Sequence, residues 1–321
     1  MGCPGLAARI LDVSMRTILC NIDGVILDAA KATVSVLDRS FLFGDSIYEV
    51  VRTHRGRLFG VRRHFERLEQ SAAHLGFALP IDRQTLLTRV RDTLAAAEHG
   101  GESYVRIVVS RGTASEPSID PACTATDPLV VVMVKELAPP DPRWRTSGLS
   151  ARLVDVLRNN RRALDPAIKS GNYLNNILGL AEAKQHGADV ALFLNSEGEL
   201  TESETSNVWL VRDGVIRTPC LAAGILAGIT RAYLLEVLSR EGLPFEEARL
   251  FEGDLRAADE IFLTSTIRDV CAITRLDGKA VGSGTAGPVT LDLAARFVRE
   301  LDRLVEVEAK EGSREGARPS Y

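Results

Sequence analysis

Short turn signals divide the chain into runs of apolar residues. Each signal is a dipeptide that ends in glycine and stands between segments rich in Val, Ile or Leu. Such dipeptides favour the tight turn of a β-hairpin. The pattern predicts hairpins, and therefore mainly antiparallel sheets, around Asp23-Gly24, Arg55-Gly56, Glu197-Gly198, Asp213-Gly214 and Asp277-Gly278.

Helical spacing occurs between these hairpins. In residues 61–75 and 226–238, apolar side chains recur at steps of three and four. This spacing places them on one face of a helix. The mixture of hairpins and amphipathic helices predicts the α+β class, in which helices flank mainly antiparallel sheets.

A proline-rich stretch at residues 137–143 predicts a domain boundary. Its prolines fix the backbone and remove hydrogen-bond donors. We expect a smaller N-terminal α+β domain over residues 1–137, a linker over 138–147, and a larger C-terminal α+β domain, which carries Lys169, over 148–307. Residues 308–321 are polar and nearly free of large aliphatic side chains, so we expect a disordered tail there.

Composition narrows the range of partners. The 39 basic and 43 acidic residues are spread along the chain, which argues against nucleic-acid binding. No apolar stretch is long enough to span a bilayer. The five cysteines are odd in number and far apart, which argues against a disulfide framework or a zinc site and predicts a reducing cytoplasm. The histidines show no metal-binding spacing, so we expect no metal.

Lys169 is the first candidate for chemistry. It stands in Asp-Pro-Ala-Ile-Lys-Ser-Gly-Asn-Tyr, just before a helical run that ends near Gly187. An amine that is desolvated at such a junction has a lowered pKa and can attack an aldehyde. The alternative is a solvated surface lysine.

Two later segments carry suitable polar groups. In residues 200–207, Glu202 and Glu204 both offer a carboxylate that suits a protonated ring nitrogen. In residues 224–231, a glycine-containing turn opens a helix with Thr230 as its N-cap, which suits a phosphate. Residues 264–266 add a second cluster of small hydroxyl donors. Ordinary loop and cap roles remain open for all three segments.

One glycine motif is misleading. Gly282, Gly284 and Gly287 form a literal G-x-G-x-x-G, but Pro288 follows at once and only one helix remains before the tail. A dinucleotide site needs that motif at the start of a βαβ unit. We therefore reject a nicotinamide site, and the absence of a G-x-S-x-G elbow argues against a serine hydrolase.

Taken in order, five motifs resemble one family. They are Asp38-Arg-Ser-Phe-Leu-Phe-Gly-Asp-Ser-Ile-Tyr-Glu49, His64-Phe-Glu-Arg-Leu68, Lys169, Thr201-Glu202 with Ser206-Asn207, and Gly228-Ile-Thr-Arg231. Together they resemble the class IV aminotransferases, the pyridoxal-phosphate (PLP) fold type IV group. That group includes branched-chain and D-amino-acid aminotransferases and aminodeoxychorismate lyases.

The resemblance implies the fold and the cofactor site. It implies a D-amino-acid aminotransferase-like fold of two α+β domains, with PLP between them, and a homodimer. Lys169 would hold PLP as a Schiff base and shuttle the substrate proton, and Glu202 would pair with the ring nitrogen. The other cofactor-binding residues would be Arg67, Ile229, Thr230 and Thr266 at the phosphate and Tyr173 at the ring oxygen.

Substrate signals within the family are mixed. Tyr104-Val-Arg106 and Arg52 resemble branched-chain members, where such residues contact substrate carboxylates. Tyr48 and the Val-Ser-Arg-Gly stretch resemble D-specific or amine-specific members, although residues 111–118 lack the Arg-x-His pair of the D-specific enzymes. The expected substrate-binding residues are Phe43, Tyr48, Arg52, Tyr104 and Arg106.

We expect a transaminase that moves an amino group between a branched-chain or aliphatic L-amino acid and a 2-oxo acid such as 2-oxoglutarate. A D-amino-acid or amine transaminase, an aminodeoxychorismate lyase and a PLP carrier without turnover remain alternatives. Arg106 also has a plain alternative, as a strand residue in a surface ion pair.

Overall fold

The computed structural model describes residues 18–315, with side chains up to residue 307. These residues form two compact units. The first comprises residues 18–138 with Ile168–Asn172, and the second comprises Pro139–Ala167 with the residues from Tyr173 onward. Lys169 therefore groups with the first unit, whereas the sequence placed it in the C-terminal domain.

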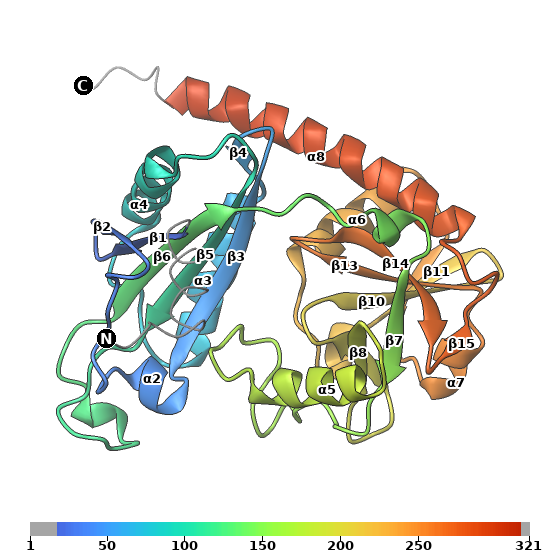
Figure 1. Cartoon of the computed structure of the whole chain (residues 1–321), viewed down its shortest axis with the longest axis horizontal. Coiled ribbons are helices and arrows are strands. Elements are labelled where there is room, and N and C mark those ends of the chain that lie inside the picture. Colours follow the sequence, from blue (N-terminus) through green and yellow to red (C-terminus); the bar gives the residue numbers. More distant parts are fainter. Residues whose placement is uncertain (1–17, 316–321) are drawn as a thin grey trace, which may run out of the picture. The chain divides into compact units, whose positions relative to one another are not determined.

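An antiparallel six-stranded sheet forms the centre of the first unit (Figure 1). Its strand order is β2-β1-β6-β5-β3-β4. The strands are β1 (Ile18–Ile22), β2 (Val25–Asp28), β3 (Ser46–His54), β4 (Arg57–Leu58), β5 (Ser103–Ser110) and β6 (Leu129–Glu136).

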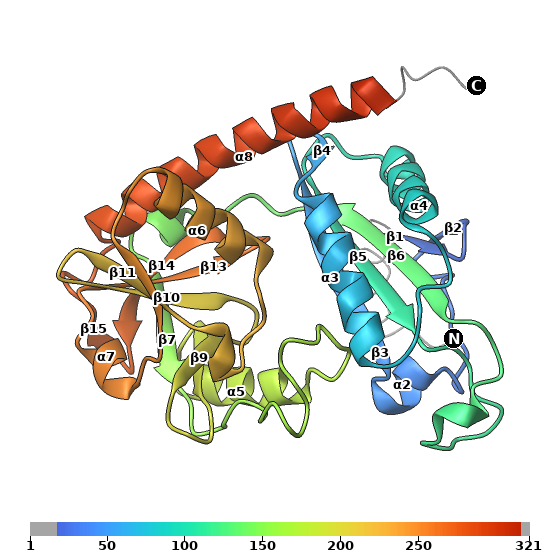
Figure 2. The ribbon, with the colours of Figure 1, turned by 180° about the vertical axis from the view of Figure 1, so that it is seen from behind.

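Two helices, α3 (Val61–His74) and α4 (Arg83–Ala96), share the core of this sheet. Figure 2 shows α3 lying across β3 and β5. Side chains alternate between the faces of a strand, so Ile47 and Val51 of β3 point to the helices and join Phe65 and Leu68 in one apolar cluster. A short helix, α2 (Arg39–Phe43), and a 3-10 helix, η1 (Pro121–Cys123), complete the unit.

The second unit holds a nine-stranded sheet with mixed pairing. Along its main path the order is β12-β11-β10-β13-β14-β7-β8-β9, and β9 also pairs with β10, which closes part of the sheet on itself. The parallel pairs are β11–β12, β14–β7 and β7–β8, and the others are antiparallel. The strands are β7 (Leu149–Leu153), β8 (Val190–Leu194), β9 (Leu200–Ser203), β10 (Asn207–Arg212), β11 (Val215–Pro219), β12 (Phe245–Ala248), β13 (Glu260–Ser265), β14 (Asp269–Leu276) and β15 (Lys279–Ala280).

Helices of the second unit are α5 (Leu174–Gln185), α6 (Ile229–Arg240), α7 (Glu252–Arg256) and α8 (Pro288–Glu315), with 3-10 helices η2 (Pro142–Arg145) and η3 (Leu221–Ala223). Helix α8 passes beside α6 (Figure 1). The backbone of residues 308–315 is thus helical, although the sequence placed it in a disordered tail, because good helix formers continue the α8 pattern. Residues 316–321 of that predicted tail lie outside the described residues.

All five predicted hairpins are present, joining β1 to β2, β3 to β4, β8 to β9, β10 to β11 and β14 to β15. In four of the turns, both central residues have positive φ, as a type I′ turn requires. The two predicted helices correspond to α3 and α6.

Within residues 18–315, no helix is both long and apolar enough to cross a membrane. The described part of the chain also contains no group of three or more His, Cys, Asp or Glu side chains arranged to hold a metal ion.

Candidate active site

Lys169 is held against β3 of the first unit. Its carbonyl accepts a hydrogen bond from the Tyr48 amide at 2.9 Å, and its own amide donates to the Ser71 hydroxyl at 3.2 Å. The next residues continue this contact, because Ser170 forms a β-bridge with Ile47. The Lys169 amine then lies 3.4 Å from the Tyr48 hydroxyl.

A glycine stands just after the lysine. A Cβ atom on Gly171 would lie 2.3 Å from the Ser46 hydroxyl oxygen. A side chain there would displace the Ser46 hydroxyl and crowd the Gly44 carbonyl at 3.1 Å, so glycine favours the close approach of this segment to β3. The Lys-Ser-Gly-Asn sequence thereby fixes the position of the lysine backbone.

The predicted substrate-binding residues of β3 and β5 share one face of the sheet. Arg52 pairs with Tyr104, and Arg106 pairs with Val50, whose neighbours Tyr48 and Arg52 point to the same side. The Arg106 guanidinium lies 4.0 Å from the Tyr48 ring centroid, and the Lys169 amine lies 4.4 Å from it. Arg106, Tyr48 and Lys169 therefore form one cluster, which the sequence did not show.

On the opposite face of β3, toward α3, lies a buried ionic cluster. The Glu49 carboxylate accepts two hydrogen bonds from Arg67, from Nε at 2.6 Å and from Nη2 at 2.8 Å. The same carboxylate lies 2.7 Å from Nδ1 of His64. The side chains of Glu49 and His64 are fully buried. Sequence reasoning selected Arg67 but missed Glu49 and His64.

Burial and charge act together on this cluster. Burial alone would raise the pKa of Glu49, but the charge and hydrogen bonds of Arg67, with His64, hold that pKa well below its usual range. Burial lowers the pKa of His64, and the nearby charges of Arg67 and Lys169 lower it further against the opposing effect of Glu49. At neutral pH the cluster therefore contains a carboxylate, a guanidinium and a neutral imidazole.

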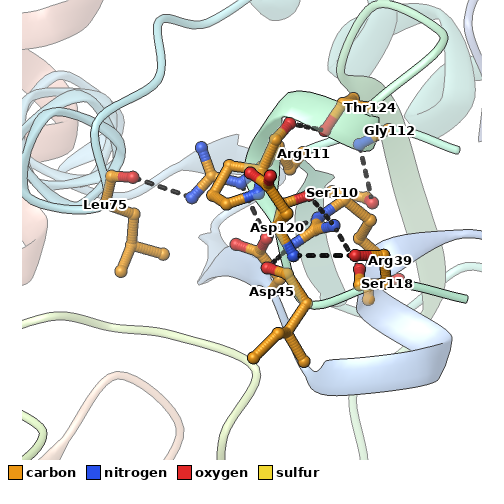
Figure 3. Close-up of polar contacts among 12 residues, drawn as sticks. Arg39, Asp45, Leu75, Ser110, Arg111, Gly112, Ser118, Asp120 and Thr124 are labelled. Carbon is orange, nitrogen blue, oxygen red and sulfur yellow. Dashed lines mark hydrogen bonds and ion pairs between the residues drawn. The ribbon is translucent and has the colours of Figure 1, made fainter. Parts of the chain in front are cut away.

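Phe43 ends α2 beside a second cluster of charged groups. Arg39 packs over the Phe43 ring, with the guanidinium carbon 5.3 Å from the centroid. Arg39 and Arg111 both donate to Asp45, at 2.9 and 2.7 Å (Figure 3). Arg39 also donates to the carbonyls of residues 118, 119 and 120. These bonds fasten α2 to the loop at 111–124, where the sequence showed no Arg-x-His pair.

In the second unit, Glu202 is engaged on both carboxylate oxygens. Oε1 accepts from Nε and Nη2 of Arg158, at 3.1 and 2.9 Å. Oε2 accepts from the Leu226 amide at 3.0 Å and lies 3.5 Å from the Asn207 amide nitrogen. These hydrogen bonds fix the position of the carboxylate. The sequence did not point to Arg158, because this residue lies in an irregular segment without any motif.

Three asparagines surround this pair. Nη1 of Arg158 donates to the side chains of Asn175 and Asn176, at 3.0 and 3.1 Å. Glu204, the other acidic candidate, instead accepts from the Ala191 amide and the Ser203 hydroxyl. Both acidic candidates are thus engaged within the second unit, and Glu202 is the one paired with a buried arginine.

Helix α6 begins two residues before the start that an N-cap at Thr230 would give. Its N-cap is Gly228, and Thr230 is the second helical residue, so the prediction of Thr230 as N-cap is wrong. Glycine is needed at 228 because a Cβ there would lie 2.0 Å from Oδ1 of Asn207. The buried hydroxyl of Thr230 has no hydrogen-bond partner within the described residues.

An unpartnered hydroxyl at a helix start fits a phosphate. The first amides of a helix point outward, and the helix dipole favours an anion there. Ile229 and Thr230 are the first two residues of α6. Thr266 directly follows β13, and Tyr173 directly precedes α5.

Comparisons with known proteins identify the family of this chain. A model of the family "Amino-transferase class IV" matches residues 46–276. A D-alanine aminotransferase of Listeria innocua is 35% identical over 279 residues, which cover 87% of this chain and 94% of that protein. The chain therefore belongs to the class IV aminotransferase family.

Solved structures of relatives bear on the fold. A branched-chain aminotransferase of Thermoproteus uzoniensis, solved with norvaline, has a TM-score of 0.79 at 29% identity, over 88% of this chain and 93% of that one. The PLP form of a branched-chain aminotransferase from Thermobaculum terrenum gives a TM-score of 0.79 at 26% identity, over the same shares. The α+β fold of PLP type IV is thus confirmed, and the protein is a PLP-dependent aminotransferase.

Proposed function

We propose that the conserved chemistry of the family is carried out here by Lys169, with Glu202 at the cofactor ring and Arg67 at the cofactor phosphate. When bound, PLP supplies an electron-withdrawing ring that stabilises negative charge at the substrate Cα. The Lys169 amine removes and returns the Cα proton. The remaining proposed cofactor contacts are Tyr173, Ile229, Thr230 and Thr266.

The roles follow from what each side chain offers. Arg158 and the Leu226 amide hold the Glu202 carboxylate in a fixed position, from which it can accept a hydrogen bond from a protonated ring nitrogen. Arg67 offers a planar, permanently charged donor that suits phosphate oxygens. The Thr230 hydroxyl needs an acceptor, which a phosphate provides.

We further propose that the amino donor is a branched-chain or aliphatic L-amino acid and that the acceptor is a 2-oxo acid such as 2-oxoglutarate. The observation that carries this proposal is the approach of Arg106 and of the Lys169 amine to the same Tyr48 ring. A carboxylate bound by Arg106 would hold the substrate close to the proton-transferring amine. Arg52, Tyr104 and Phe43 complete the proposed substrate side.

The first experiment mixes the holoenzyme with excess L-leucine or D-alanine and follows the absorption band of the bound cofactor. Rapid change with L-leucine alone supports the proposed substrate. Rapid change with D-alanine alone contradicts it and favours the second candidate, a D-amino-acid transaminase, which the 35% identity to the Listeria enzyme supports. No change with either substrate, with cofactor still bound, would turn attention to amines and to pyruvate release from aminodeoxychorismate.

Arg106→Met tests the carboxylate contact. We expect KM for the amino acid to rise about tenfold or more with a smaller change in kcat, because a charge-assisted hydrogen bond is lost. Lys135→Met is the matched control, since Lys135 also lies over an aromatic ring, that of Tyr104, at 5.2 Å. An equal effect of the two substitutions would contradict a specific role for Arg106.

The assembly and location complete the proposal. We infer a homodimer from the family resemblance, and light scattering of the purified protein tests it. We also infer that the protein is located in a reducing cytoplasm. Four cysteines lie in the described residues, at positions 20, 123, 220 and 271, and all are free thiols.

A further inference from the structure

Glu49 is a buried carboxylate to which the proposed reaction gives no part. It lies in β3 between Ile47 and Val51, on the apolar face that α3 covers. An acidic residue at such a position is unfavourable unless it is paired. Its partners are Arg67 and His64.

We propose that Glu49 is the positioning residue for Arg67 and thereby sets the affinity of the protein for the phosphate of its cofactor. The inference rests on the proposed contact of Arg67 with that phosphate. Glu49 itself touches neither cofactor nor substrate in this scheme.

The hydrogen bonds fix the guanidinium as a plane. Glu49 binds the edge formed by Nε and Nη2 through two separate oxygens, at 2.6 and 2.8 Å. Two parallel bonds prevent rotation about the last side-chain torsion, which a single bond would allow. The remaining N–H directions of Arg67 are thereby set before any anion arrives, which lowers the ordering cost of binding.

His64 fixes the carboxylate in turn. With Glu49 ionised, Nδ1 of His64 carries the hydrogen and donates it at 2.7 Å. The other ring nitrogen, Nε2, is buried and has no hydrogen-bond partner within the described residues, as expected for the unprotonated nitrogen of that tautomer. The Glu49 carboxylate therefore receives three donor groups, two from Arg67 and one from His64.

Because three N–H groups donate to the Glu49 carboxylate, Glu49→Gln is the informative substitution. A glutamine keeps the size of the side chain but offers one oxygen to three donors, and its NH2 group would face donors instead of acceptors. Arg67 would then lose its two-point contact and its fixed plane. A residue that served stability alone would change cofactor binding without regard to the phosphate.

The experiment titrates apoprotein with PLP and, separately, with pyridoxal, which lacks the phosphate, and follows cofactor absorbance. For Glu49→Gln we expect PLP to bind about tenfold more weakly and pyridoxal to bind as in the wild type. For Arg67→Gln we expect a PLP-specific loss of at least that size. In the double variant the PLP affinity should match that of Arg67→Gln, because Glu49 acts through Arg67.

Asp45→Asn is the matched control. Asp45 also accepts bonds from two arginines of the first unit, Arg39 and Arg111. We expect this variant to unfold at a lower temperature while the ratio of PLP to pyridoxal affinity stays at the wild-type value. A change in that ratio as large as that of Glu49→Gln would overturn the inference.

The outcomes separate the inference from the function on which it rests. If Arg67→Gln weakens PLP and pyridoxal equally, the proposed phosphate contact of Arg67 fails. If Arg67→Gln is PLP-specific but Glu49→Gln is not, or if the two losses add, only the role of Glu49 fails. Should Glu49→Gln not fold, Glu49→Asp keeps the charge and shortens its reach, and a wild-type affinity ratio in that variant would also overturn the inference.

Discussion

In each unit, the proposed cofactor contact belongs to a buried pair of opposite charges, and the two pairs are arranged in opposite senses. In the first unit, the proposed cofactor contact is the cation, Arg67, and a carboxylate holds it. In the second, the proposed contact is the carboxylate, Glu202, and a cation, Arg158, holds it. In both, the guanidinium uses its Nε and Nη2 atoms toward the carboxylate. The groups around each pair differ in a way that matters for pH.

The first pair is bonded to a histidine, and the second to amides. His64 contacts Glu49, whereas Asn175, Asn176 and Asn207 surround Arg158 and Glu202. An amide does not titrate between pH 5 and 8, but an imidazole does. Only the surroundings of Arg67, through His64, therefore include a group that can gain a proton in this pH range among these side chains.

Removal of the cation from the second pair has the largest expected effect. Arg158→Met leaves the Glu202 carboxylate buried without the guanidinium that pairs with it and fixes its position. Glu202 would then no longer be held where it can accept the hydrogen bond from the cofactor ring nitrogen. We expect kcat for transamination to fall about a hundredfold or more and the second unit to lose about 3 kcal/mol of stability.

The stability loss can be followed in the second unit separately. Both tryptophans, Trp144 and Trp209, lie in that unit, so tryptophan fluorescence reports its unfolding in urea. Arg256→Met is the control, because Arg256 pairs with Glu252 and Asp277 at a half-exposed position and should cost about 1 kcal/mol or less. Wild-type turnover in Arg158→Met would refute the proposed dependence of Glu202 on Arg158.

The histidine of the first pair should make stability fall in mild acid. Burial keeps the pKa of His64 below its usual value in the folded protein, while the unfolded chain takes up the proton near pH 6.5. Below that pH the unfolded state binds more protons, so stability decreases as pH falls. Between pH 7 and 5.5 we expect a loss of about 1 kcal/mol that His64→Asn removes.

Urea unfolding followed by circular dichroism at several pH values measures this slope. Asparagine retains an N–H near the position of Nδ1, so the bond to Glu49 can persist without a titrating ring. Glu49 acts at lower pH, because its depressed pKa gives stability that is lost as pH falls below about 4.5. An unchanged slope in His64→Asn would show that His64 does not titrate as described.

The smallest effect concerns a single hydroxyl at the start of α6. Thr230→Val removes a buried hydroxyl that has no partner within the described residues, so the apoprotein should be as stable as the wild type or slightly more stable. PLP should bind about tenfold more weakly, through the lost bond to its phosphate. Equilibrium binding and thermal unfolding of the apoprotein measure the two quantities.

A second threonine supplies the control for that prediction. The buried hydroxyl of Thr218 donates to the Val208 carbonyl at 2.9 Å. Thr218→Val should therefore destabilise the apoprotein by about 1 kcal/mol and leave PLP binding unchanged. The reverse pattern in the two variants would contradict the assignment of Thr230 to the phosphate.

Local sequence signals predicted the hairpins and helices but not the two buried pairs of opposite charges. Asp-Gly turns fixed the hairpins because their backbone geometry depends on two adjacent residues. The Glu49 and Arg67 pair depends on the packing of α3 on β3, which no local pattern contains. One available signal was missed: an acidic residue on the same strand face as Ile47 and Val51 had to be paired.

The grouping of Lys169 with the first unit was not predicted, for a related reason. The proline-rich stretch suggests that every residue after it belongs to the second domain. Residues Ile168–Asn172 nevertheless return to the first unit. One β-bridge, Ile47 with Ser170, and a few hydrogen bonds of backbone and side chains accompany that return. Such isolated pairing lacks the alternating pattern that identifies a strand in a sequence.

That five-residue return limits how the protein can be divided or recombined. A fragment that ends at Ala138 would lack the segment that pairs with the edge of β3, and the complementary fragment would carry Lys169 without the strand that holds it. An exchange of C-terminal halves between relatives would also import a new partner for Ser46 and Tyr48. Lys169 is thus flanked in sequence by residues of the second unit but packs with the first. The two units can therefore be exchanged only together.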